Sequence, residues 1–349
     1  MRIDDDLKLT FSDVLIRPKR STLKSRSEVS LSRIFKFRHT DREWKGIPVV
    51  AANMDTTGTF QIANELQKHK LLTCLQKFYS VSEIKKAIKN GMDPYNIAIT
   101  SGSTEESMEL LKRKMAIHKN LQYICLDVAN GYREDFLQFV RKVRKDFTDK
   151  IIIAGNVATR EMSEALILAG ADIVKVGIGP GSVCTTRKVA GVGYPQLSAI
   201  SECADAAHGL GGHVMSDGGC TSPGDIAKAF AAGADFVMLG GMLAGHTESG
   251  GELIENKDGT KSKVFYGMSS EKAMITYFGD VAKHRAPEGK EVKVPYKGKV
   301  EKTVQSILGG VRSACSYVGA RRIKDLPKCT TFVRVTITTN EIYTPHEVS

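Results

Sequence analysis

Short apolar runs alternate with longer amphipathic stretches along the chain between residues 47 and 245. Runs of this kind, bounded by glycine and polar residues, predict buried strands of a parallel sheet, and the stretches between them predict helices that cover both of its faces. Eight strands are predicted, at residues 47–55, 72–77, 96–102, 123–130, 150–157, 172–181, 213–220 and 235–245.

Eight strand and helix units within about 200 residues match an α/β fold of the (β/α)8 type, the TIM barrel. A doubly wound open sheet is the alternative. Its fingerprint, G-x-G-x-x-G after an early strand, is missing from the chain. The barrel is therefore the predicted architecture, and 349 residues suit one domain over residues 1–349.

Three regions lie outside the repeating pattern. Residues 1–45 form an N-terminal extension that we expect to pack outside the barrel. Residues 246–299, after the eighth strand, are polar and irregular, and a stretch of that length is expected to be a lid or a disordered loop. Helical periodicity returns at 300–318, and residues 332–338 predict an edge strand.

Charge points to an anionic partner, because the formal net charge is +11. Nucleic acids and small phosphorylated molecules both have the required charge. The lysines and arginines are scattered, and no block interleaves them with aromatic residues as single-strand binding requires. We therefore expect nucleotide phosphates as ligands and no nucleic-acid partner.

Cysteine usage and the absence of apolar segments indicate the compartment. The seven cysteines include no C-x-x-C pair, so reduced thiols are expected, with neither disulfides nor a zinc site. The N-terminus is acidic, and no run approaches the ~20 apolar residues of a membrane span. A cytoplasmic protein without membrane contact is predicted.

The most informative segment is the glycine-rich turn 177–187, which ends the sixth predicted strand and presents Cys184. Glycines allow backbone conformations closed to other residues and the close approach of a ligand. Clustered backbone N–H groups and Arg187 would stabilise a thiolate there. Cys184 is thus a candidate nucleophile, although a small buried cysteine would be the ordinary alternative.

Polar and glycine residues also follow other predicted strands, where a barrel gathers its active site. The pairs Gly218, Gly219 and Gly240, Gly241 follow strands seven and eight, the usual place of a phosphate cradle. An aldolase-like mechanism is disfavoured, because Lys175 is the nearest Schiff-base candidate and is better explained as structural. The other strand-end segments are 53–55, 127–130 and 155–156.

Together these segments resemble the IMP dehydrogenase and GMP reductase family nearly end to end. The dehydrogenases usually insert CBS modules after the first strand, and an Arg-Tyr pair in their lid activates water. In this chain only a short helical stretch separates the first strand from Leu72, and in its lid Thr276, not arginine, precedes Tyr277. The reductases are favoured, with an IMP dehydrogenase lacking CBS modules as the alternative. The resemblance is carried by residues 9–15, 52–55, 177–187, 190–196, 216–219, 238–242, 266–269, 285–289 and 309–315.

The resemblance implies an oxidoreductase that uses NADPH to convert GMP to IMP and ammonia in purine salvage. Cys184 would form a covalent thioimidate with the purine, and Thr186 with Glu288 would deliver the proton to the departing ammonia. It also implies a homotetramer and a bound monovalent cation such as K⁺.

The same resemblance assigns binding residues. The implied GMP contacts are Asp217, Gly218, Gly219, Gly240, Gly241, Gly267, Met268, Ser269, Arg285, Ala286, Pro287 and Gly289. The implied cofactor contacts are Ser25 and Arg26 from a neighbouring subunit together with Lys77, Asp127, Val128, Ala129, Ile178, Gly179, Met268, His284, Arg285, Ser313, Ala314, Cys315 and Ser316. The implied cation ligands lie at Gly179, Gly181, Cys184 and Arg187.

Overall fold

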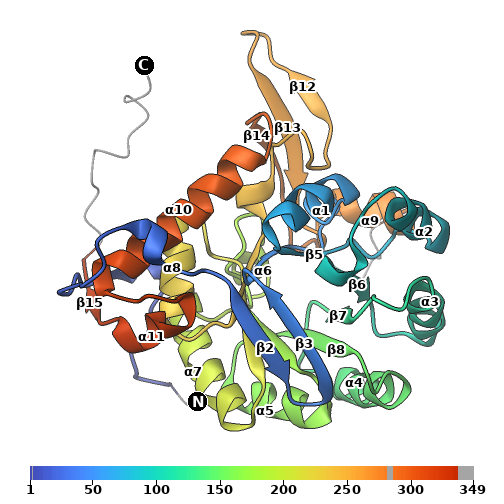
Figure 1. Cartoon of the computed structure of the whole chain (residues 1–349). Helices are drawn as coiled ribbons and strands as arrows, with labels where there is room; N and C mark the ends of the chain where they lie inside the picture. The colour runs from blue at the N-terminus through green and yellow to red at the C-terminus, as the bar shows by residue number, and fades with distance from the viewer. Residues whose placement is uncertain (2, 281–285, 337–349) are drawn as a thin grey trace.

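Eight parallel strands close into a barrel in the computed structural model, which describes residue 1, residues 3–280 and residues 286–336 (Figure 1). The predicted TIM barrel is confirmed, and each strand lies within its predicted run. The strands are shorter than predicted because the polar residues at their ends leave the ladder. They are β4 (Val49–Ala51), β5 (Leu72–Cys74), β6 (Ile97–Ser101), β7 (Tyr123–Asp127), β8 (Ile151–Val157), β9 (Ile173–Val176), β10 (His213–Asp217) and β11 (Phe236–Leu239).

Helices follow the strands and surround the barrel (Figure 1). Local signals set their ends: Ser80 and Ser222 form capping boxes at two helix starts, and Gly170 ends another helix with φ +118°. The surrounding helices are α1 (Phe60–Leu66), α2 (Val81–Lys89), α3 (Glu105–Met115), α4 (Glu134–Asp146), α5 (Arg160–Ala169), α7 (Gln196–Gly209), α8 (Pro223–Ala231) and α10 (Glu301–Val318), the last confirming the helix predicted at 300–318.

The strands are apolar throughout because both of their faces are buried. In β7, Tyr123 and Cys125 belong to the cluster that fills the barrel interior, whereas Ile124 and Leu126 pack with the surrounding helices. Successive side chains of a strand point to opposite faces, so this alternation is what a barrel strand requires.

The N-terminal extension only partly follows its prediction. The hairpin of β2 (Arg33–Phe37) and β3 (Thr40–Gly46) does not pack outside the barrel, because Phe35, Phe37 and Trp44 join the interior cluster. The Phe35 ring lies 4.3 Å from that of Phe236, and the Phe37 ring lies 6.1 Å from that of Tyr123. Phe236 and Tyr123 are the first residues of β11 and β7. The hairpin therefore seals the end of the barrel where the strands begin.

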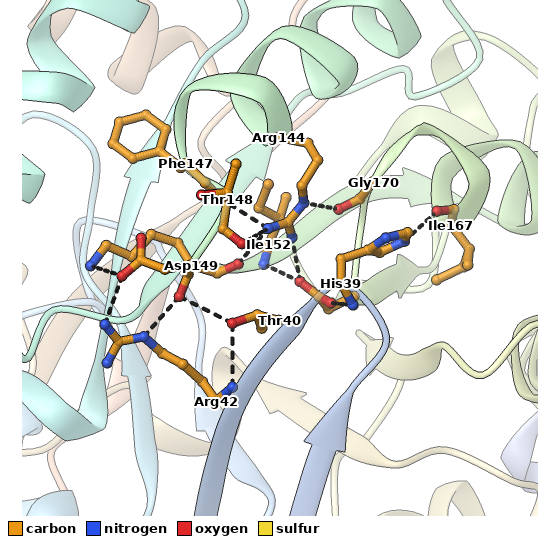
Figure 2. Close-up of polar contacts among 12 residues, drawn as sticks. His39, Thr40, Arg42, Arg144, Phe147, Thr148, Asp149, Ile152, Ile167 and Gly170 are labelled. Atoms are coloured by element: carbon orange, nitrogen blue, oxygen red, sulfur yellow. Dashed lines mark hydrogen bonds and ion pairs between the residues drawn. The ribbon is translucent and has the colours of Figure 1, made fainter.

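Polar contacts anchor the turn of this hairpin (Figure 2). The buried Asp172, which precedes β9, accepts hydrogen bonds from the backbone N–H of His39 at 3.0 Å and from Arg144 Nη2 at 2.6 Å. Arg42 pairs with Asp149 at 2.7 Å. A buried carboxylate needs such donors, and Asp172 obtains them from both the hairpin and α4.

The region after β11 is more regular than predicted. Its described residues contain a three-stranded antiparallel sheet and helix α9 (Glu271–Phe278), so the expectation of an irregular stretch is wrong there. The edge strand predicted at 332–338 is confirmed for Phe332–Arg334 (β15), which pairs with β1 (Val14–Ile16). Residues 337 and 338 of that prediction lie outside the described residues. The sheet strands are β12 (Leu253–Glu255), β13 (Lys261–Tyr266) and β14 (Glu291–Pro295), and α11 (Leu326–Cys329) precedes β15.

The seven cysteines are all free thiols. Across the part of the chain that the structure describes, every helix is too short or too polar to cross a bilayer.

Candidate active site

The cysteine loop, residues 177–187, leaves β9 as a tight glycine turn. Gly179 has φ +80°, and a Cβ there would lie 2.7 Å from Cγ of Arg187, so the turn requires glycine. The N–H of Cys184 donates to the Gly181 carbonyl at 3.1 Å, and α6 (Thr186–Val189) begins two residues later. The loop thus leaves Cys184 partly exposed at the C-terminal rim of the barrel.

A short hydrogen-bonded series connects the thiol to a carboxylate. Cys184 Sγ lies 3.2 Å from Thr186 Oγ1, and that hydroxyl donates to Glu288 Oε2 at 2.7 Å. Because the threonine proton is directed at the carboxylate, the threonine oxygen is free to accept the thiol proton. The series can therefore move a proton between sulfur and Glu288.

Backbone pairing holds Glu288 in place although it lies far away in sequence. The Thr185 N–H donates to the Glu288 carbonyl at 3.0 Å, and the Lys290 N–H donates to the Val183 carbonyl at 2.9 Å. On its other side this segment pairs with residues 267–270, where the Glu288 N–H donates to the Ser269 carbonyl at 3.0 Å. A Cβ at Gly289 would lie 3.0 Å from the Ser270 nitrogen, so any larger residue would press on that backbone.

These contacts bring together several residues predicted to bind GMP. Gly267 lies against the 286–290 segment, and its N–H donates to the Lys290 carbonyl at 3.2 Å. Met268 Sδ accepts the Asp55 N–H at 3.4 Å. Ser269, Ala286, Pro287 and Gly289 lie in the same two segments. Arg285, predicted to contact both ligands, and His284, predicted to contact the cofactor, lie outside the described residues.

The two glycine pairs predicted to cradle a phosphate pack against the cysteine loop. A Cβ at Gly218, whose φ is +91°, would lie 2.9 Å from Pro180 Cγ, and one at Gly241 would lie 2.9 Å from Ser182 Oγ. Gly219 also has a left-handed backbone, with φ +86°. The ends of β10 and β11 and the cysteine loop therefore form one continuous surface.

A charged network lies in the barrel under this surface. Lys175 Nζ lies 2.5 Å from Asp127 and 2.9 Å from Asp217, and Asn156 Nδ2 donates to Asp217 at 2.9 Å. Burial alone would raise the pKa of Asp127, but the charge and hydrogen bond of Lys175, together with Lys77 and Asn53, outweigh it and hold that pKa below its usual value. Although burial opposes its charge, Lys175 has its pKa raised well above the usual value by the two carboxylates.

Sequence reasoning placed Asp127 and Asp217 at strand ends but did not connect them. The available signal was a lysine within the apolar run of β9, a position where an unpaired charge would be costly.

Asp55, after β4, is another partly buried carboxylate at the rim. Burial raises its pKa, against the opposing effect of its hydrogen bonds with Tyr277 and Tyr266. The Tyr266 hydroxyl donates to Asp55 Oδ2 at 2.8 Å. Tyr277 also stacks on Phe78, so α9 is fastened to the loop that follows β5. The sequence indicated only that Asp55 would lie on the rim.

The predicted cofactor residues fall into two separate groups. Lys77, Asp127–Ala129 and Ile178–Gly179 follow β5, β7 and β9 at the rim. Ser25 caps, and Arg26 begins, the 3-10 turn Arg26–Glu28. This turn packs against α10, the helix that contains residues 313–316. In Figure 1 the C-terminal half of α10 lies beside α8, across the barrel from β7. One chain therefore does not bring the two groups together.

Arg187 does not meet the thiol as the sequence suggested. Its Nη2 donates to the Tyr194 carbonyl at 2.6 Å, and its side chain packs over Gly179 and Gly193. In the described hydrogen bonds, Thr186 is the side chain that meets Sγ of Cys184.

The chain is a (β/α)8 barrel whose C-terminal rim carries a candidate active site centred on Cys184. Residues 8–346 match the IMP dehydrogenase / GMP reductase domain, and the protein belongs to this family of oxidoreductases. It is 61% identical over 342 residues to GMP reductase 2 of Mus musculus, with 98% of each chain covered. It is 59% identical over 349 residues to GMP reductase of Caenorhabditis elegans, covering 99% of this chain and 97% of that one. It is 59% identical over 345 residues to GMP reductase of Escherichia coli O139:H28, covering 98% and 99%.

Proposed function

We propose that the protein catalyses the NADPH-dependent reductive deamination of GMP to IMP and ammonia, in purine salvage. The observation that carries the proposal is the series Cys184, Thr186 and Glu288, because covalent attack and departure of ammonia need a nucleophile and a proton source at one place. The names of the relatives support GMP as the substrate. Thr276 supports reduction over hydrolysis, because it stands where the dehydrogenases have the arginine of their Arg-Tyr pair.

The chain's own residues perform the proton transfers. Cys184 gives its proton through Thr186 to Glu288, and the resulting thiolate adds to C2 of the guanine ring. The 2-amino group then takes the proton back from Glu288 through Thr186. It leaves as ammonia, with cleavage of the C2–N bond, so that a thioimidate joins C2 to sulfur. Using one proton twice removes the need for an external acid.

The second half of the reaction restores the enzyme. NADPH, when bound, would supply the hydride that C2 takes up. The C–S bond then breaks with its electron pair returning to sulfur. IMP leaves, and Cys184 is again a thiolate. The net change consumes one proton when ammonia is written as NH₃.

The rim residues would hold the nucleotide. Asp217 suits the ribose hydroxyls, because a carboxylate accepts hydrogen bonds from both. Gly218, Gly219, Gly240 and Gly241 would present backbone N–H groups to the phosphate. Residues 267–269 and 286–289 would contact the base beside Cys184.

NADPH fits the rim only in part within one chain. Lys77, Asp127 to Ala129, Ile178 and Gly179 would hold the nicotinamide side, where Asp127 offers a carboxylate that is 27% exposed. Ser25, Arg26 and residues 313–316 would come from a neighbouring subunit of a homotetramer, and an arginine suits the 2′-phosphate.

A monovalent cation such as K⁺ would be held by carbonyl oxygens of the cysteine loop, at Gly179, Gly181 and Cys184. The Gly181 carbonyl already accepts the Cys184 N–H at 3.1 Å. A carbonyl oxygen has two lone pairs, so this bond leaves it able to bind an ion.

Purine salvage of this kind would place the enzyme in the cytoplasm.

The test mixes the purified enzyme with GMP and NADPH and follows the loss of reduced-cofactor absorbance. We expect that loss together with IMP formation, no turnover by Cys184→Ala, and a nucleotide adduct on Cys184 in mass spectra of quenched enzyme. Absence of turnover with GMP, alongside NADH formation from IMP and NAD, would overturn the proposal in favour of a dehydrogenase lacking CBS modules.

A further inference from the structure

Lys175 lies beneath the rim and connects two carboxylates that the proposed function assigns to different ligands. Its side chain is 3% exposed, and its Nζ lies 2.5 Å from Asp127 Oδ1 and 2.9 Å from Asp217 Oδ2. In the barrel, β9 adjoins β10, which ends at Asp217, but is separated by β8 from β7, which ends at Asp127. The lysine side chain therefore spans the interior between the two predicted subsites.

We propose that Lys175 is a positioning residue that couples binding at the nucleotide subsite to binding at the cofactor subsite. The inference rests on the proposed function for the identity of the two ligands. Lys175 itself touches neither, because it is buried, whereas the side chains of Asp127 and Asp217 are 27% and 22% exposed.

The hydrogen bonds leave each carboxylate able to serve a ligand. Asp217 Oδ2 accepts hydrogen bonds from both Lys175 and Asn156, and no residue in the described part of the chain donates to its Oδ1. Asp127 meets the lysine through Oδ1. Asp127 also has a side-chain hydrogen bond with Asn53. The chain thus orients both carboxylates, and because an ionised carboxylate has about four lone-pair sites, each can still accept from a ligand hydroxyl or amide.

One ammonium shared by two carboxylates produces the coupling. When ribose hydroxyls donate to Asp217, part of its charge is satisfied and its attraction for the ammonium falls. The ammonium then holds Asp127 more firmly, so the cofactor meets an acceptor that is already oriented. Linkage is reciprocal, so the cofactor must strengthen nucleotide binding by the same factor.

The strand backbone fixes the origin of the lysine. Gly155 on β8 is in register with Lys175, and a Cβ at Gly155 would lie 2.4 Å from the Lys175 carbonyl oxygen and 2.7 Å from its Cβ. The two strands therefore approach so closely that the position of Lys175 cannot adjust. When a ligand binds, only the ammonium end of the Lys175 side chain and the two carboxylates can therefore move.

The test is a binding cycle without chemistry. The Kd of GMP is measured by calorimetry with and without saturating NADP⁺. Every protein compared, the wild-type reference included, carries Cys184→Ala so that no thioimidate can form, and the ratio of the two Kd values gives the coupling factor. For the wild type we expect a ratio of about 5 or more, within the usual range of coupling between sites. Lys175→Met should bring the ratio close to one, and Lys175→Arg should restore part of it.

A matched control is Arg144→Met, which removes a partly buried cation from the buried carboxylate of Asp172 at the opposite end of the barrel. It should leave the ratio at the wild-type value. Asp127→Asn serves if Lys175→Met fails to fold, because it retains the lysine and one carboxylate. Its ratio should also approach one.

The inference is overturned if Lys175→Met has the same ratio as the wild type. If Lys175→Met does not fold, an unchanged ratio in Asp127→Asn overturns it. In that case normal GMP turnover by the enzyme that retains Cys184 leaves the proposed function intact. Failure of the proposed function would appear in the wild type itself, as absent GMP or NADP⁺ binding, and the inference would fall with it.

Discussion

The hydroxyl of Thr186 is the residue-scale feature on which the proposed chemistry depends. In the wild type, contacts of 3.2 and 2.7 Å link Cys184 to Glu288 through the Thr186 hydroxyl. Thr186→Val keeps the side-chain shape but breaks this link. We expect kcat to fall by about 10²- to 10⁴-fold, the usual contribution of general acid–base catalysis, with little change in the Kd of GMP. Steady-state kinetics and calorimetry check both values.

The matched control is Thr185→Val. The hydroxyl of Thr185 does not cap α6, and this residue enters the site through its backbone N–H. Wild-type kcat in Thr186→Val, or an equal loss in Thr185→Val, would contradict the proton path.

At the other end of the barrel, His208 and Asp235 give a pH-dependent contribution to stability. A hydrogen bond of 2.7 Å to Asp235 raises the pKa of His208 above its ordinary value. A raised pKa stabilises the fold fully below the unfolded pKa, about 6.5, and the benefit is lost as the pH rises through the folded value. His208→Gln should therefore lower Tm by about 1–3 °C near pH 6 and by less near pH 9.

Thermal melts at the two pH values check this difference. His69→Gln is the control, because no hydrogen bond or ion pair of the His69 side chain is found in the described part of the chain. An equal loss of Tm at both pH values in His208→Gln would show that the histidine acts by packing alone.

Among the elements, the β2–β3 hairpin has the largest predicted effect on stability. Trp44 is fully buried in the barrel interior, and its Nε1 donates to Asn96 at 3.1 Å. Trp44→Ala should lower the free energy of unfolding by about 3–5 kcal/mol, because it leaves a cavity under the strands. Ile34→Ala, in the same hairpin but 57% exposed, should change it by less than about 0.5 kcal/mol.

Denaturant unfolding of both variants measures these values. If Trp44→Ala cost no more than Ile34→Ala, the hairpin would not be part of the barrel core.

Gly218, in the loop after β10, can be compared in the same way with Gly91, which follows α2. Gly218 has φ +91° and a Cβ there would lie 2.9 Å from Pro180, whereas Gly91 has φ +101° and open space around it. Alanine strains the backbone at both positions, but only at Gly218 must the cysteine loop shift. We expect Gly218→Ala to weaken GMP binding about tenfold, or about 1.4 kcal/mol, and Gly91→Ala to leave it unchanged. Calorimetric titration with GMP tests both, and equal affinities would place the phosphate elsewhere.

At the scale of the whole molecule, the separation of the two cofactor groups predicts shared active sites. Cys184→Ala and Arg26→Glu should each be nearly inactive alone. Mixed oligomers, co-expressed with two different tags and purified on both, should regain activity, because a barrel with Cys184 can receive Arg26 from its neighbour. With random assembly about a quarter of the sites are intact.

NADPH oxidation by the mixed oligomers is the measurement. Activity no higher than that of the separate variants would mean that each chain completes its own site. A mixture of two Cys184→Ala chains with different tags provides the background.

The sequence alone determined the features that depend on local pattern. Apolar runs buried on both faces identify the eight strands, and glycines at their ends identify the cysteine loop and the two glycine pairs. Cys184 stood out by its place in that loop, whereas Thr186 and Glu288 were recognisable only through the resemblance to a family. These features are readable because strand periodicity and turn chemistry involve neighbouring residues.

Only the tertiary structure decided the contacts between distant residues. Thr186 meets Glu288 across 102 positions, and Lys175 meets Asp127 and Asp217 across 48 and 42. The hairpin at 33–46 alternates buried and exposed residues like any surface hairpin, and closure of the barrel placed its aromatic face inside. Spacing along a chain does not specify which strand ends converge, because convergence depends on how the barrel closes and twists.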